Sequence, residues 1–227
     1  GTAETTINVI ANTTENITIQ EGANITLEFD EDITLNGYFA PFRGNLTING
    51  GTINNENASY SAIEINAGTL VLNDVKVTSK RHGVRIDGAV TATINGGEYR
   101  LSATSGTRHA VNVSGAANVT ITDGIFVGPA GTTMDSGSAV CVQADAKVTI
   151  EGGDFSGGKN ATLGVSGTMT VTGGTFDQDV TDYCANGYVC ELNTTTNKYE
   201  VFRGLTGKGT EANPYLIKNL SDLVFFR

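Results

Sequence analysis

Two arginine–histidine pairs in the first half of the chain are the residues best suited to bind a ligand. They are Arg81-His82 and Arg108-His109, and each stands directly before a short segment in which apolar residues alternate. In a repeating fold the two pairs occupy equivalent positions on neighbouring strands, ~5 Å apart. The guanidinium fork binds carboxylate, sulfate or phosphate. The sequence therefore predicts an anion-binding patch for an acidic glycan or an acidic protein surface.

The surroundings of these pairs are basic, although the chain as a whole is acidic. The formal net charge is −10, yet between Lys76 and His109 six basic residues stand against Asp87 and Glu98. The alternative to a binding patch is a solvated face on which these two carboxylates pair with the arginines. The expected ligand contacts are Arg81, His82, Arg85, Arg100, Arg108 and His109.

Charge and composition weigh against several classes of function. An acidic chain lacks the basic surface that displaces counterions from nucleic acid or docks on anionic membranes. No stretch approaches the ~18 apolar residues of a membrane span. There are 29 Gly and only 3 Pro, and Thr, Asn, Val and Ile are abundant, which favours strands and turns. We therefore expect a β-rich protein with neither nucleic acid nor a membrane as its partner.

A short template recurs along the chain and must position the arginine–histidine pairs. It alternates apolar and polar residues, turns, and ends on an apolar residue, as in LTINGGTI (46–53), LVLNDVKV (70–77), ATINGGEY (92–99), VTITDGIF (119–126), VTIEGGDF (148–155) and MTVTGGTF (169–176). A second alternating strand, such as GVRI (83–86) or AVNV (110–113), recurs between the copies. No unit can bury its apolar face alone, but stacked coils can. The pattern predicts an all-β parallel β-helix of about seven coils; a β-sandwich, the alternative, would show antiparallel hairpins instead.

The register of the template assigns the core and isolates one variable corner. Ile94, Ile121 and Ile150 are expected in one interior row, and the residues after the turn form a row that ends in Tyr99, Phe126, Phe155 and Phe176. Differences in coil length all fall between the template and the second strand, so these loops line one edge. Insertions in repeat proteins collect on one face, often the binding face, although tolerated drift of loop length is an equal alternative. We expect Tyr60, Met134 and Tyr183 to be exposed anchors on this edge.

The ends of a solenoid need caps. We expect residues 1–20 to form an N-terminal cap or first partial coil and 21–192 the β-helix. Residues 188–202 have the pattern of a hairpin, with 193–203 assigned as the hairpin cap. Residues 204–227 are expected to be a short extension, a linker followed by the start of a further module.

Other candidate chemistry is weaker. Cys184 and Cys190 are six residues apart across a turn, so a local disulfide is geometrically possible; three reduced cysteines are the alternative. A loop with Asp177, Asp179 and Asp182 has oxygen ligands for Ca²⁺, but a solvated acidic loop is the expected reading. We expect no cofactor and no metal site. No paired carboxylates with the pattern of a glycoside hydrolase are found, so an enzyme is not the favoured interpretation.

Several segments carry a family resemblance that covers nearly the whole chain. NITIQEGANITLEF (16–29), the repeated coils, GGTFDQDVTDYCANGYVCELN (173–193) and GTEANPYLIKNLSDL (209–223) resemble large modular surface proteins, adhesins, of gut Gram-positive bacteria. Those proteins contain right-handed parallel β-helix segments of the pectate-lyase-like kind. The resemblance implies secretion, an extracellular location at the bacterial cell surface, and adhesion or binding of host molecules.

Residues and resemblance together predict a non-catalytic binding module, monomeric within a longer chain. The expected ligand is a host glycoprotein, an immunoglobulin or a polysaccharide, bound through the variable edge or an adjoining sheet face. One alternative is a polysaccharide lyase or hydrolase on the same fold. The other is a structural spacer.

Overall fold

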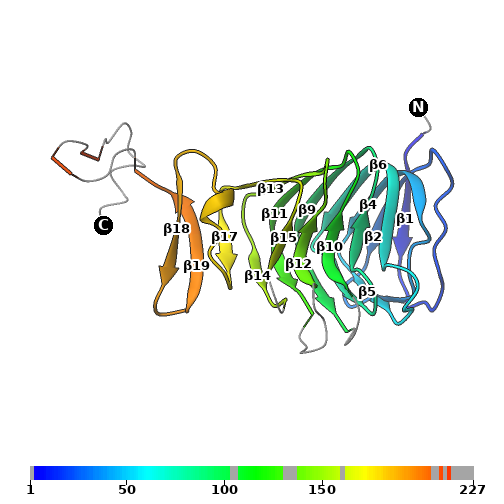
Figure 1. Cartoon of the computed structure of the whole chain (residues 1–227). Helices are drawn as coiled ribbons and strands as arrows, with labels where there is room; N and C mark the ends of the chain where they lie inside the picture. The colour runs from blue at the N-terminus through cyan, green and yellow to red at the C-terminus, as the bar shows by residue number, and fades with distance from the viewer. Residues whose placement is uncertain are drawn as a thin grey trace.

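The computed structural model of this chain describes residues 3–102, 107–129, 137–158, 162–205, 210–211 and 214–215. Over these residues the chain forms nineteen strands, and β1 to β17 wind into a parallel β-solenoid of about seven turns (Figure 1). β1 (Thr5–Val9) lies at one end of the solenoid, and β18 (Tyr188–Asn193) and β19 (Lys198–Arg203) lie at the other. The predicted parallel β-helix is confirmed, and the β-sandwich alternative is wrong.

Strand segments of successive turns stack into three faces. The first face consists of β1, β2 (Asn24–Phe29), β4 (Phe42–Asn49), the end of β6 (Ile63–Asn73), the starts of β9 (Val90–Leu101) and β11 (Asn118–Val127), β13 (Lys147–Ile150) and β16 (Thr168–Val171). The second consists of β3 (Thr34–Asn36), β5 (Thr52–Asn55), β7 (Lys76–Ser79), the ends of β9 and β11, β14 (Asp154–Ser156) and β17 (Gly174–Phe176). The third consists of the start of β6, β8 (Val84–Ile86), β10 (His109–Val113), β12 (Ser138–Val142) and β15 (Leu163–Val165).

The first face has the register that the template predicts. Ile121 pairs with Ile94 on one side and with Ile150 on the other, and all three side chains are fully buried. Burial of each such side chain stabilises the fold by about 1.5–3 kcal/mol before conformational entropy is counted. The predicted interior row is confirmed.

A chain of side-chain hydrogen bonds runs along the outside of the first face. Each donor in it, a threonine hydroxyl or an asparagine amide, donates to the side chain of the preceding turn. The bonds are Thr122 to Asn95 (2.9 Å), Asn95 to Asn73 (2.8 Å), Asn73 to Asn49 (2.6 Å) and Asn49 to Glu28 (2.6 Å). All four bonds therefore have the same polarity along the axis. We call this the asparagine ladder. It ties five successive turns together and fixes their register.

Aromatic rings fill the interior under the second face. Tyr99, Phe126, Phe155 and Phe176 are fully buried and stack with ring centroids 4.9 Å apart at each step, about one strand spacing. Glycine at the preceding corner makes room for the rings, since a Cβ on Gly124, at φ +129°, would lie 3.0 Å from the Phe126 ring. The hydroxyl of Tyr99 is buried without a hydrogen-bond partner in the described part of the chain. Burial and the charge of Asp74 raise the pKa of this hydroxyl.

The two ends of the solenoid differ. At the C-terminal end β17 pairs antiparallel with β19, which pairs antiparallel with β18, so the hairpin predicted over 188–202 is confirmed. At the N-terminal end β1 pairs in parallel with β2, and two single bridges, Thr13–Leu35 and Ile17–Phe39, complete an irregular first turn. Most of the expected linker and further module (206–209, 212–213 and 216–227) lies outside the described residues. No helix in the described ranges has the length and apolar character needed to cross a membrane.

Candidate functional site

The two arginine–histidine pairs lie at the corner between the second and third faces. Arg81 and His82 connect β7 to β8, and Arg108 stands directly before His109, the first residue of β10. We call this corner the variable edge; its described residues include 56–60, 80–82 and 107–108. The turns approach closely here, since a Cβ on Gly83 would lie 2.5 Å from the carbonyl oxygen of Ala110.

The histidines stack on one another, as their equivalent positions predict. The ring centroids of His82 and His109 are 5.4 Å apart, and the ring planes differ by 4°. Nδ1 of His82 accepts the backbone N–H of His109 (3.1 Å), and Nδ1 of His109 accepts the backbone N–H of Ser138 (3.1 Å). A ring nitrogen that accepts carries no proton, so each neutral ring holds its proton on Nε2. Each histidine side chain thus adds a hydrogen bond between neighbouring turns to those that the backbone makes.

The histidines are structural residues rather than exposed ligand contacts. His82 is 7 % exposed and His109 is 4 % exposed, so their expected role as surface contacts is not what the structure shows. The template predicted that the two histidines are neighbours, but it did not give the direction of a side chain at the start of a strand or in the corner before it. Burial, His109 and then Arg81 lower the pKa of His82 to about 3, and burial and Arg108 lower the pKa of His109 to about 4. Both rings are therefore neutral near pH 7.

Arg81 and Arg108 lie close together on the half-exposed rim above this stack. Both raise the electrostatic cost of protonating His82, and the pKa of Arg108 is itself lowered by burial and by the charge of Arg81. Nε of Arg108 is buried without a hydrogen-bond partner among the residues that the structure describes, and one of its terminal nitrogens donates to the carbonyl oxygen of Thr107 (2.9 Å). Within the described residues, neither arginine forms an ion pair with a carboxylate. The two like charges thus lie close together without a carboxylate counter-ion from the described part of the chain.

The remaining basic residues of the predicted patch are neutralised. Arg85 bridges Glu64 (3.0 Å) and Asp87 (3.2 Å), and Arg100 pairs with Glu98. The solvated-face alternative therefore holds for Arg85 and Arg100. Of the arginines predicted to bind an anion, Arg81 and Arg108 are those without a carboxylate partner among the described residues.

Of the two expected loop anchors that the structure describes, only Tyr60 is an exposed side chain. It is 43 % exposed and stacks on Tyr38. Tyr183 lies in the 3-10 helix η1 (Thr181–Tyr183) and is half-buried against the core. Met134 falls outside the described residues.

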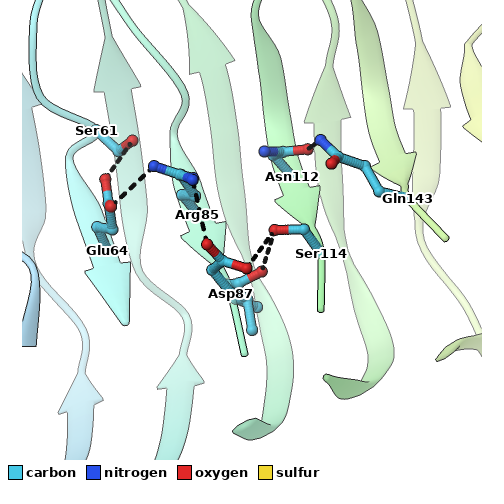
Figure 2. A network of polar contacts seen from close by, with 8 residues as sticks. Ser61, Glu64, Arg85, Asp87, Asn112, Ser114 and Gln143 are labelled. Carbon is cyan, nitrogen blue, oxygen red and sulfur yellow. Dashed lines mark hydrogen bonds and ion pairs between the residues drawn. The ribbon is translucent and has the colours of Figure 1, made fainter. Parts of the chain in front are cut away.

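A polar network that was not predicted from the sequence covers the outside of the third face (Figure 2). Glu64 accepts from Ser61 (3.4 Å) and from Arg85; Asp87 accepts from Arg85 and from Ser114 (2.9 Å). Gln143 donates to Asn112 one step further along (3.1 Å). Glu64, Arg85 and Asn112 pair on successive strands, so their side chains form one outward column. Their equivalent positions in the repeated second strand were the sequence signal for this column. An open hollow of about 430 Å³ beside it is lined by Arg43, Glu64, Asn66, Arg85, Asp87 and Gly88.

The cysteines carry free thiols in this structure. Cys184 and Cys190 are not bonded to each other, so the predicted disulfide is not formed, and Cys141 is also free. Sγ of Cys184 donates instead to the carbonyl oxygen of Val180 (3.6 Å). Burial raises the pKa of all three thiols, to about 11 for Cys184, with Cys190 and Asp179 contributing there. The thiols are therefore protonated near pH 7 and are weak nucleophiles.

The acidic loop shows local hydrogen bonding. Asp179 accepts from the backbone N–H (2.9 Å) and hydroxyl (2.6 Å) of Thr181, and Asp177 accepts from the backbone N–H of Gly157 (3.0 Å). Over the described ranges, no three His, Cys, Asp or Glu side chains gather in a way that would hold a metal ion.

A comparison with protein-family models finds no match, and comparisons with curated proteins and with solved structures find none either.

Proposed function

We propose that this chain is a non-catalytic binding module that recognises an acidic glycan, or an acidic patch of a glycoprotein, through Arg81 and Arg108. The observation that carries the proposal is the contrast between these two arginines and their neighbours. Arg85 and Arg100 are paired with carboxylates, whereas Arg81 and Arg108 repel one another without such a partner in the described residues. A carboxylate or sulfate seated between them would relieve that repulsion and accept from both forks.

The rim and the stack beneath it suit such a ligand. The neutral histidine stack adds no charge, and it holds neighbouring turns together directly under the arginines. Because the chain as a whole carries −10, attraction of an anion has to be local to this edge. The resemblance to adhesins of Gram-positive gut bacteria supports the same proposal, with an extracellular, cell-surface location and a host or polymeric ligand.

Arginine substitution with a charge-matched control tests the proposal. Binding of the native chain to heparin, polygalacturonate and a sialylated glycoprotein is measured by isothermal titration calorimetry. The double variant Arg81→Ala and Arg108→Ala is expected to weaken binding of at least one of these probes by about tenfold or more, a loss of about 1.4 kcal/mol. The control Lys76→Ala with Lys147→Ala removes two exposed charges elsewhere and leaves binding unchanged. Equal losses in both double variants, or no binding to any acidic probe, would refute the proposal.

One observation favours the enzymatic alternative. Glu64 and Asp87 present two carboxylates on the outside of the third face, beside an open hollow, which is the kind of pair that glycoside hydrolysis uses. Both are held by Arg85, an arrangement more typical of a structural ion pair. Release of reducing or unsaturated ends from polygalacturonate, abolished by Glu64→Gln, would establish an enzyme instead of a binding module.

A further inference from the structure

Tyr38 and Tyr60 form an aromatic platform on the variable edge. Their ring centroids are 4.7 Å apart and their planes differ by 6°, so the rings lie face to face on neighbouring turns. Tyr60 is 43 % exposed and Tyr38 is half-buried, unlike the fully buried rings of the interior. Exposed apolar area of this kind is typical of a binding surface rather than of a core.

The loop that carries Tyr60 is fixed by asparagine side chains. Nδ2 of the buried Asn55 donates to the carbonyl oxygen of Tyr60 (2.7 Å) and to Oγ of Ser79 (3.1 Å). Oδ1 of Asn55 accepts the backbone N–H of Asn57, and Oδ1 of Asn57 accepts that of Ser59 (2.8 Å). A loop held in this way loses little further entropy when a ligand binds.

A pocket of about 290 Å³ opens beside the platform. Its lining includes Tyr38 and the asparagines Asn16, Asn36, Asn54 and Asn57. Nδ2 of Asn54 donates to Oδ1 of Asn36 (3.2 Å), which leaves Nδ2 of Asn36 as a donor and Oδ1 of Asn54 as an acceptor without partners among the described residues. The one charged group of the lining, Glu56, is paired with Lys80. The pocket therefore offers amide donors and acceptors with its charge compensated.

We propose that Tyr38, Tyr60 and this asparagine-lined pocket bind an uncharged sugar residue. A pyranose has an apolar C–H face, which packs on an aromatic ring, and a rim of hydroxyls that both donate and accept, as amide groups do. Stacked tyrosines beside amide groups that lack a partner in the described part of the chain match both parts of such a ligand. The site does not include the arginine pair, and so it goes beyond the proposed anion recognition.

Titration with uncharged oligosaccharides tests the sugar site. The full chain is titrated with cellohexaose, maltohexaose, mannohexaose and chitohexaose, followed by calorimetry and by saturation-transfer NMR. At least one of them is expected to bind, Tyr60→Ala to weaken that binding by about tenfold, and Tyr60→Phe, which keeps the ring, to retain it. Ile125→Ala is the matched control, because Ile125 is 42 % exposed on another face and its loss leaves binding unchanged.

The outcomes separate the two proposals. Binding of an uncharged probe that survives Arg81→Ala with Arg108→Ala but not Tyr60→Ala supports the sugar site, whatever happens with acidic probes. Absence of binding to all four probes overturns the sugar site, as does a loss of equal size in Ile125→Ala. Loss of uncharged-probe binding in the arginine variant but not in Tyr60→Ala also overturns it and assigns the contact to the arginine pair.

Discussion

Acidification is expected to weaken the fold through the buried histidine stack. The pKa of an unfolded histidine is about 6.5, whereas in the fold it is lowered to about 3 for His82 and about 4 for His109. Below pH 6.5 the histidines therefore bind protons in the unfolded chain but stay neutral in the folded chain. The stability that the neutral rings contribute is complete above pH 6.5 and is lost as the pH falls below it. The loss is ~1.4 kcal/mol per pH unit for each ring, or roughly 4 kcal/mol for both between pH 6.5 and pH 5.

Urea unfolding followed by circular dichroism at pH 7 and pH 5 measures this loss. The matched variant is His82→Asn with His109→Asn, since the amide oxygen of asparagine can accept the same backbone N–H but does not titrate. Carboxylates titrate in both proteins, and the difference between them isolates the rings. The reasoning is refuted if the variant loses as much stability as the native chain on acidification. It is equally refuted if the ring proton signals in NMR, of which two sets are expected because the chain has two histidines, titrate near pH 6.5.

Three further substitutions test how the solenoid is held together. Tyr99→Phe is expected to raise the free energy of unfolding by about 1 kcal/mol, because it removes a buried hydroxyl that has no hydrogen-bond partner in the described ranges. A loss of stability on urea titration would contradict this. Gly68→Ala is expected to lower the melting temperature much more than Gly22→Ala does. Both glycines have positive φ, so the backbone strain is shared. A Cβ on Gly68 would lie 2.0 Å from the carbonyl oxygen of Gly44, whereas nothing lies within 4 Å of a Cβ on Gly22. Asn73→Ala interrupts the asparagine ladder and is expected to lower the free energy of unfolding by about 1 kcal/mol on urea titration. The loss is small because water can replace part of the lost hydrogen bonding at this half-exposed position. An unchanged free energy of unfolding would show that the ladder contributes nothing.

The repeat made the backbone arrangement predictable. In a parallel solenoid, residues with the same template position must stack, so the rows through Ile121 and Phe126 follow from sequence spacing alone. The approach of the two arginine–histidine pairs follows from the same rule. A strand template says which side of the sheet a strand residue faces, but it says nothing of a side chain in the corner before the strand, and the burial of His82 was missed for that reason.

Other parts of the site depend on side-chain partners that spacing does not give. Glu64 and Arg85 are 21 residues apart and share an outward column, so the template could have predicted their ion pair. The second ion pair of Arg85, with Asp87, depends on side-chain rotamers, which the template does not give. The stack of Tyr38 on Tyr60 was not foreseen, because Tyr38 lies in an early turn whose second strand is reduced to the single bridge Ile17–Phe39 and does not match the repeated segments.

The placement of β1 and the β18–β19 hairpin at opposite ends of the axis has a mechanical consequence (Figure 1). Tension between the two ends acts along the direction in which each turn is hydrogen-bonded to the next, so the turns detach in succession, as in unzipping, rather than shearing all at once. Paired residues are 21 apart between Thr26 and Thr47 and 29 apart between Thr120 and Thr149, so each detached turn adds roughly 70–100 Å of extended chain. The length of each step in a pulling trace would therefore distinguish the long turns, such as that between Thr120 and Thr149, from the short ones.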